Sequence, residues 1–197
     1  MATSKDARKG IEISSQRKAA SLAHDLRKFI QTDHVFFFCI GTDRSTGDSL
    51  GPMVGSMLEK AGYTNVMGTI HDPIHALNLA EKIKLIPKGV TVIAIDASHG
   101  NSEDVGKMTF AKGAILPGTG VGKTLPAVGD YCIKGTVVGY SPYPQVSLGN
   151  VRLSVVLTLA EALVSSIQQA FPFEAKTRRS LRTTKRLDPQ SGGYVTV

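Results

Sequence analysis

Apolar residues follow two patterns along this chain: unbroken runs of strand length and longer stretches with helical spacing. The runs over residues 35–41 (VFFFCIG) and 90–97 (VTVIAIDA) predict strands that are buried on both faces of a sheet. Helical spacing over residues 14–31 and 49–62 predicts two helices, and Pro52 is compatible with the second because it falls in the first turn. This alternation is typical of parallel strand–helix–strand units.

Weaker patterns supply the remaining elements. A short strand is predicted at residues 65–70, and a helix opened by a proline is predicted at residues 73–86. The later elements are two strands, a loop and a long apolar helix, at residues 107–111, 130–139, 141–145 and 151–171. Asn150 is expected to cap that last helix. We therefore predict an α/β fold, a three-layer α/β/α sandwich with a mostly parallel central sheet.

Charge divides the chain into three parts. The net charge is +7, yet residues 1–28 hold seven basic and three acidic residues, and residues 174–197 hold six and two. The stretch between them carries ten basic and eleven acidic residues, so the basic character belongs to the two ends. The predicted organisation is an N-terminal segment with an amphipathic helix, an α/β domain and a basic, flexible tail, at residues 1–31, 32–173 and 174–197.

Composition narrows the classes of function. Cys39 and Cys132 each lie in an apolar run, which is typical neither of a disulfide framework nor of a metal cluster. No apolar run is long enough to span a bilayer, and charges occupy the place of a signal peptide's apolar stretch. We therefore expect a cytoplasmic protein with no membrane contact. The basic tail allows contact with nucleic acid, but no nucleic-acid-binding signature accompanies it, and a solvated tail is favoured.

Two aspartates stand out as a candidate catalytic pair. Ligands of parallel α/β sheets bind outside the carboxyl ends of the strands. Asp96 lies at the end of the predicted strand 90–97, and Asp48 lies where the loop after the first strand meets the next helix. Both carboxylates are therefore expected at the same edge of the sheet. Close carboxylates do not both ionise easily, so one can act as an acid while the other activates water.

Structural roles compete with this interpretation. Asp48 would also suit the N-cap of a helix that begins at Ser49. Asp96 would also suit a loop that it fixes by accepting backbone hydrogen bonds. Asp43 and Asp130 are loop carboxylates of the kind found in turns, and Asp43 is kept as a candidate substrate contact. Spacing along the chain leaves these alternatives open.

Histidines near the same edge offer further chemistry. His71, His75 and His99 are each compatible with a general base or a third metal ligand, and equally with a surface or packing role. His99 is the best placed, three residues after Asp96, and is a candidate substrate contact. None of the three has ligand spacing to another metal-binding residue, so we predict no metal and no cofactor.

A glycine-rich segment at residues 117–124 (PGTGVGKT) differs from a phosphate-binding loop. Pro117 stands where that signature requires glycine, and the residues that follow leave no room for the helix that would hold the phosphates. An ATPase or GTPase function is therefore disfavoured. We predict instead that Gly118, Gly120 and Gly122 shape a loop that passes close to the carboxylates and contacts substrate.

Three motifs in the same order resemble the YyaC-type sporulation proteins. They are GTDRSTGDSLGP, the strand end IAIDA and LPGTGVGK, at residues 41–52, 93–97 and 116–123. The likeness covers about residues 33–170. These proteins are similar to the germination protease of spore-forming bacteria and, more distantly, to hydrogenase maturation proteases. The resemblance implies a fold of phosphorylase/hydrolase type and an intracellular role in sporulation, in the cytoplasm or forespore.

The resemblance also implies an activity. The two acidic residues assigned to catalysis in germination protease fall on Asp48 and Asp96, and the substrates of that enzyme are small DNA-binding spore proteins. The implied function is an aspartate-dependent endopeptidase that acts on a peptide or small spore protein. One alternative is a non-catalytic sporulation protein that binds a peptide or protein partner in the same crevice, and another is a metal-dependent hydrolase that recruits a histidine.

This chain departs from those relatives in three respects. It is much shorter than germination protease, and Asp96 is followed by SHGN instead of the protease's own loop. It also has no counterpart of the histidine that completes the nickel site in hydrogenase maturation proteases.

Overall fold

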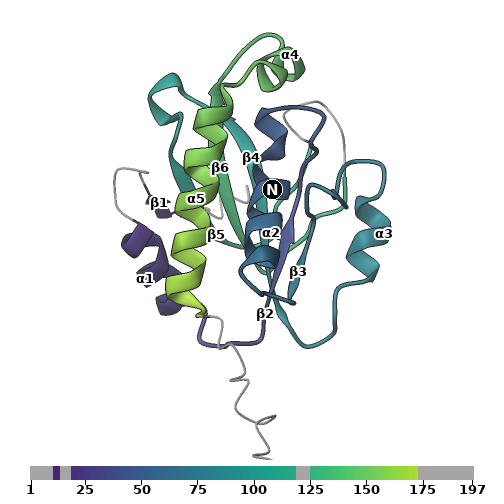
Figure 1. Ribbon diagram of the computed structural model, residues 1–197, viewed down its shortest axis with the longest axis vertical. Helices are drawn as coiled ribbons and strands as arrows, with labels where there is room; N and C mark the ends of the chain where they lie inside the picture. Colours follow the sequence, from purple (N-terminus) through teal and green to yellow (C-terminus); the bar gives the residue numbers. More distant parts are fainter. Residues whose placement is uncertain (1–10, 14–18, 119–124, 173–197) are drawn as a thin grey trace, which may run out of the picture.

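The computed structural model describes residues 11–13, 19–118 and 125–172, which form a sheet with helices on both faces. In Figure 1, α1, α2 and α5 lie in front of the sheet and α3 lies at its other side. The bounds of these helices, with the short α4, are Ala19–Phe29, Leu50–Lys60, Leu79–Lys84, Pro144–Gly149 and Leu153–Ala170 for α1 to α5. The predicted three-layer α/β/α arrangement is confirmed.

The sheet has six strands within the described residues, in the order β1-β5-β6-β4-β2-β3. From β1 to β6 the bounds are Ile11–Ile13, Val35–Cys39, Val66–Met67, Thr91–Gly100, Met108–Lys112 and Tyr131–Gly139. β2 pairs in parallel with β3 and β4, and β4 pairs in parallel with β6. β5 runs antiparallel to β6, and β1 antiparallel to β5. The two apolar runs at residues 35–41 and 90–97 thus form neighbouring parallel strands, and the predicted mostly parallel sheet is confirmed.

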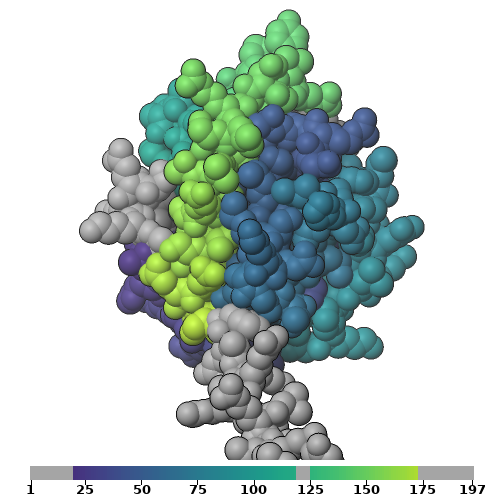
Figure 2. All heavy atoms as spheres, in the orientation of Figure 1, coloured from purple at the N-terminus to yellow at the C-terminus, as the bar shows by residue number. Residues whose placement is uncertain are grey.

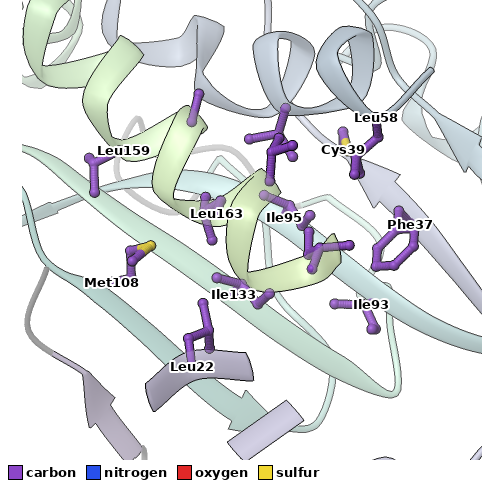
Figure 3. Close-up of a cluster of buried hydrophobic side chains, with 14 of the residues drawn as sticks. Leu22, Phe37, Cys39, Leu58, Ile93, Ile95, Met108, Ile133, Leu159 and Leu163 are labelled. Atoms are coloured by element: carbon purple, nitrogen blue, oxygen red, sulfur yellow. The ribbon is translucent and has the colours of Figure 1, made fainter. Parts of the chain in front are cut away.

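Alternation along β2 divides the core between the two faces of the sheet. Phe37 and Cys39 belong to the cluster under α1, α2 and α5, and Figure 3 shows Cys39 beside Leu58 of α2. Phe38 faces the opposite way, into a second cluster with side chains of α3. Because every residue of β2 is buried, its run of apolar residues contributes to both clusters. Each such side chain stabilises the fold by about 1.5–3 kcal/mol.

One of the described helices, α5, is long and apolar enough to cross a membrane, judged by length and composition alone. Its apolar residues have another explanation, because Val156, Leu159, Leu163 and Ile167 are buried against the sheet and the neighbouring helices. Figure 2 shows α5 lying alongside α2 along the front of the molecule. The composition of α5 is that of a helix packed on a core.

The predicted helix at residues 73–86 is wrong over its first half, since α3 covers only Leu79–Lys84. Ile74 instead forms a parallel bridge with Ile40. The Asn78 side chain accepts a hydrogen bond from the backbone N–H of His75 (2.9 Å) and donates one to the carbonyl of Pro73 (3.0 Å). These local bonds compete with helix formation.

Three other boundaries differ from the sequence predictions. β3 is two residues long, because Gly68 has a φ of 94° that a strand does not continue through. The loop predicted at residues 141–145 gives way to α4, which begins at Pro144. Asn150 ends α4 instead of capping α5, and its side chain donates to the carbonyl of Val146 (2.7 Å). The N-cap of α5 is the extended residue Arg152.

Candidate active site

Asp48 is placed by a tight turn after β2. The chain leaves the sheet at Gly41, whose φ is 145°, and a side chain there would overlap the carbonyl oxygen of Asp48. The N–H of Thr42 donates to that same oxygen (3.1 Å), which closes the loop. A 3₁₀ turn, Gly47–Ser49, then leads into α2. The sequence therefore brings Asp48 back to the end of the strand that it follows.

The sheet opens between β2 and β4 at this point. Cys39, the last residue of β2, pairs with Ile95, and Asp96 is the next residue of β4. From β2 the chain continues to β3 on one side, whereas from β4 it continues to β5 and β6 on the other. Crevices at such switch points are the usual ligand sites of α/β sheets. Here the crevice is a cleft of about 600 Å³.

Both predicted catalytic aspartates line this cleft. The predicted position of Asp96 at the carboxyl end of its strand is wrong, since β4 continues to Gly100. Backbone pairing of β4 with β6 extends past Asp96, whereas β2 has already ended. Asp96 is therefore inside β4 but at the carboxyl end of β2, and the two carboxyl groups share the cleft.

Electrostatics couples the two carboxyl groups. Burial, and then the nearby charge of Asp48, raise the pKa of Asp96 to about 8, although the Ala97 N–H (2.9 Å) and Lys134 act in the opposite direction. Burial also raises the pKa of Asp48, while the imidazole of His99 lowers it. Asp96 therefore holds a proton at neutral pH beside a second carboxylate. Such a pair supplies an acid and a base in one cleft.

The competing structural role of Asp48 receives no support from the contacts. The N-cap position of α2 is Ser49 and that of the 3₁₀ turn is Thr46, so the Asp48 side chain caps neither helix. Asp96 does accept a backbone hydrogen bond, from Ala97, but within a strand instead of a loop. Asp130 has a structural role, because its carboxylate accepts from the N–H of Val92 (2.8 Å).

The histidines divide between the cleft and the surface. His75 and His99 line the cleft, whereas His71 is exposed outside it. His99 lies in β4, beyond the predicted strand end at residue 97, and its Nε2 lies 3.2 Å from the carbonyl oxygen of Pro144. This contact joins β4 to the start of α4. Among the residues that the structure describes, no group of three or more His, Cys, Asp or Glu side chains is arranged to hold a metal ion.

The remaining candidate residues have different positions. Gly118 lines the cleft with a φ of 72°, while Asp43 is exposed and is not among the lining residues. Gly120 and Gly122 lie outside the described residues. Of the three glycines that we predicted to contact substrate, Gly118 is the one that the structure describes, and it lies at the cleft.

The lining residues that the sequence did not predict as site residues include a lysine and two exposed side chains. Lys134 reaches the cleft from β6, and the apolar side chains of Leu77 and Tyr140 lie at its mouth, 89% and 75% exposed. Alternation along residues 130–139 predicts the face to which Lys134 points, but only the pairing of β6 with β4 places it beside Asp96. The exposed Leu77 carries no signal in the sequence, because it falls in a stretch predicted to be helical.

Asp96 keeps its proton in the folded state up to about pH 8, which predicts a free energy of unfolding that falls with rising pH. Between the ordinary carboxyl pKa of 3.8 and the folded value of about 8, the folded state binds more protons than the unfolded state, so the free energy of unfolding decreases as pH rises. Because Asp96 is partly exposed, we expect a loss of only about 2 kcal/mol across this window. Asp96→Asn should remove most of this slope, which urea titrations at several pH values would measure.

A control for that experiment is Glu59→Gln, at an exposed position of α2 outside the cleft. It should leave the pH dependence of unfolding as in the original protein. Equal slopes for Asp96→Asn and the original protein would show that Asp96 ionises in the folded state as it does in the unfolded chain.

Comparison with known proteins places the chain in a family. The sequence profile of the family described as "Protein of unknown function (DUF1256)" matches residues 11–166. The chain belongs to this family. It is 45% identical over 136 residues to "Uncharacterized protein YyaC" of Bacillus subtilis (strain 168), covering 66% of this chain and 65% of that protein. The resemblance to YyaC-type proteins is thus confirmed, and the chain spans about two thirds of the length of that relative.

A solved structure gives a weaker likeness. The crystal structure of the NiFe hydrogenase maturation protease HycI from Thermococcus kodakarensis KOD1 aligns with a TM-score of 0.37 and 15% sequence identity. The alignment covers 68% of this chain and 95% of that protein. A likeness of this size carries no argument about activity, which has to be argued from the cleft itself.

Proposed function

We propose that the protein is an aspartate-dependent endopeptidase that hydrolyses a peptide or small spore protein in the cleft between β2 and β4. The observation that supports this most directly is the pair Asp48 and Asp96 lining one cleft, with each pKa raised by burial and that of Asp96 raised further by the charge of Asp48. A volume of about 600 Å³ falls within the range of small-molecule and peptide sites.

The environments of the two carboxyl groups assign their roles. Asp96 keeps its proton at neutral pH and is the acid that protonates the leaving amine. Asp48, whose ionised form His99 favours, is the base that takes a proton from the attacking water. The resemblance to germination protease supports the same two residues, and it suggests small DNA-binding spore proteins as substrates and the cytoplasm or forespore as the site of action.

A second candidate function is non-catalytic binding of a peptide or protein partner in the same cleft. It is favoured by the exposed apolar side chains of Leu77 and Tyr140 at the mouth, which a bound chain would cover. It is also favoured by Asp96, whose one hydrogen bond among the described residues comes from a backbone N–H. Because both candidate functions use the same cleft, binding alone does not distinguish them. A cleavage assay does.

The test is a search for cleavage products. The protein should be incubated with small DNA-binding spore proteins and with a mixed peptide library, and new termini should be identified by mass spectrometry. The double variant Asp48→Asn/Asp96→Asn keeps the shape of both side chains and serves as the control. Products that the double variant also releases would point to a contaminating protease. Binding of the same substrates without cleavage would favour the second candidate.

A further inference from the structure

Lys134 lies beside the aspartate pair for a reason built into the sheet. Lys134 of β6 is the register partner of Asp96 of β4, and neighbouring strands lie about 4.8 Å apart. The preceding alternate residues of the two strands, Ala94 and Cys132, face the cluster on the α3 side of the sheet. Asp96 and Lys134 therefore start side by side on that same face, and both line the cleft.

The ammonium group of Lys134 is not used by the fold. Among the described residues no carboxylate lies within ion-pair distance of it, and it makes no hydrogen bond to protein. The side chain is half-buried, yet no buried side-chain nitrogen of the described residues lacks a partner. The Lys134 Nζ is therefore accessible to solvent, on a residue that lines the cleft.

Among the residues that the structure describes, no carboxylate is an ion-pair partner of this ammonium. The described charged and imidazole side chains that line the cleft are Arg44, Asp48, His75, Asp96, His99 and Lys134. Asp96, the neighbour of Lys134 in the sheet, holds a proton there, and Asp48 comes from the separate loop before α2. A positive charge in a partly desolvated cleft is stabilised strongly by an anion that forms next to it.

We propose that Lys134 is a third catalytic residue of this cleft, which binds the carbonyl oxygen of the scissile peptide bond and stabilises the oxyanion formed there. The inference rests on the proposed endopeptidase function and adds the group that the aspartate pair lacks. A lysine donates hydrogen bonds in three directions from a compact charge, which suits an oxygen whose charge grows during the reaction.

The chemistry balances without any further reactant. Asp48 takes a proton from water as the water oxygen bonds to the carbonyl carbon, and the π electron pair moves onto the oxygen that Lys134 holds. The oxyanion then re-forms the carbonyl and the carbon–nitrogen bond breaks, while Asp96 gives its proton to the leaving amine. The proton on Asp48 then passes to Asp96, which restores the pair, and the new carboxyl group gives its proton to the released amine. One water is consumed, and Lys134 keeps its protons throughout. The product carboxylate leaves from the same ammonium.

The kinetic test uses three variants and a cleaved substrate. Lys134→Met keeps the length of the stem and removes the charge, and we expect kcat to fall by about 10²-fold while KM changes by less than about threefold. Lys134→Arg restores a charged donor and should recover at least about tenfold of that loss. Lys112→Met, at an exposed position of β5 outside the cleft, should retain the original kcat. An unchanged kcat in a folded Lys134→Met, or in Lys134→Ala if the former does not fold, would overturn the proposal.

A binding test separates this inference from the proposed function. N-acetyl-leucine carries a carboxylate where N-acetyl-leucinamide carries an amide, and both can be titrated at millimolar concentration while protein NMR shifts are followed. We expect the carboxylate to bind at least about tenfold more tightly, and this preference to disappear in Lys134→Met. If no substrate is ever cleaved, the endopeptidase proposal fails, but a preference lost in the variant would still support Lys134 as the anion-binding group. Equal binding of the two probes to the original protein would overturn it.

Discussion

Asp48→Asn and Asp96→Asn should each lower kcat/KM for peptide cleavage by about 10²- to 10⁴-fold and leave the fold intact. Asparagine has nearly the shape of aspartate, but it cannot take a proton from water or give one to the leaving amine. The two variants differ in which proton transfer they remove, because Asp96 is the protonated member of the pair and Asp48 the ionised one. Melting curves recorded beside the kinetics separate loss of chemistry from loss of structure.

The pH profile adds a readout that a structural role would not produce. Activity should fall above about pH 8 as Asp96 loses its proton, and it should fall in acid as Asp48 gains one at a pH above its ordinary titration range. The result is a bell-shaped profile of kcat/KM against pH, and its two limbs report the coupled titrations of Asp48 and Asp96. Glu59→Gln is again the matched control and should keep the full profile. Original activity in either asparagine variant would refute the aspartate pair.

Gly51→Ala should be among the most damaging single-methyl changes in the described part of the protein. A Cβ at Gly51 would overlap the carbonyl oxygen of Ile40, with the other backbone atoms of Ile40 close behind. Backbone atoms cannot swing aside as a side chain does, so α2 would have to move off the end of β2. We expect a loss of about 3 kcal/mol, net of the roughly 1 kcal/mol by which alanine favours a helix, and a Tm lower by roughly 6–12 °C.

The control for this prediction is Gly149→Ala. Gly149 is also a helical glycine, the last residue of α4, but no atom lies within 4 Å of the position that its Cβ would take. Its Tm should stay within about 2 °C of the original or rise slightly. Equal effects of the two substitutions on Tm would show that close contact between α2 and β2 is not what requires glycine at position 51.

Asp48 and Asp96 line one cleft, and the sequence allows this shared position to be expected for a physical reason. The apolar run at residues 35–41 has the length and the aromatic composition of a buried strand, and the position of its end follows from where the run stops. The end of β4 was not predictable in the same way. Residues 98–100 (SHG) have no apolar pattern, and they are extended because β6 offers them backbone partners.

Other features of the site depend on contacts that no local pattern records. The position of Lys134 beside Asp96 follows from the register of β4 against β6, which is a long-range property of the sheet. The first half of the predicted helix at residues 73–86 was lost to the side-chain bonds of Asn78. Those bonds leave Leu77 exposed at the cleft, so a failed helix prediction marks a wall of the candidate site.

The edge strands of the sheet limit the ways in which a substrate could be bound. Among the described residues the outermost strands are β3, with two residues, and β1, of which residues 11–13 are described. Strand addition needs a longer row of free backbone groups than β3 provides, and an edge this short is also a poor template for sheet-to-sheet aggregation. A chain that enters the cleft would therefore not be held by strand addition at the β3 edge. It would be recognised through its side chains and its scissile carbonyl, so its sequence would affect binding more than its tendency to form extended structure.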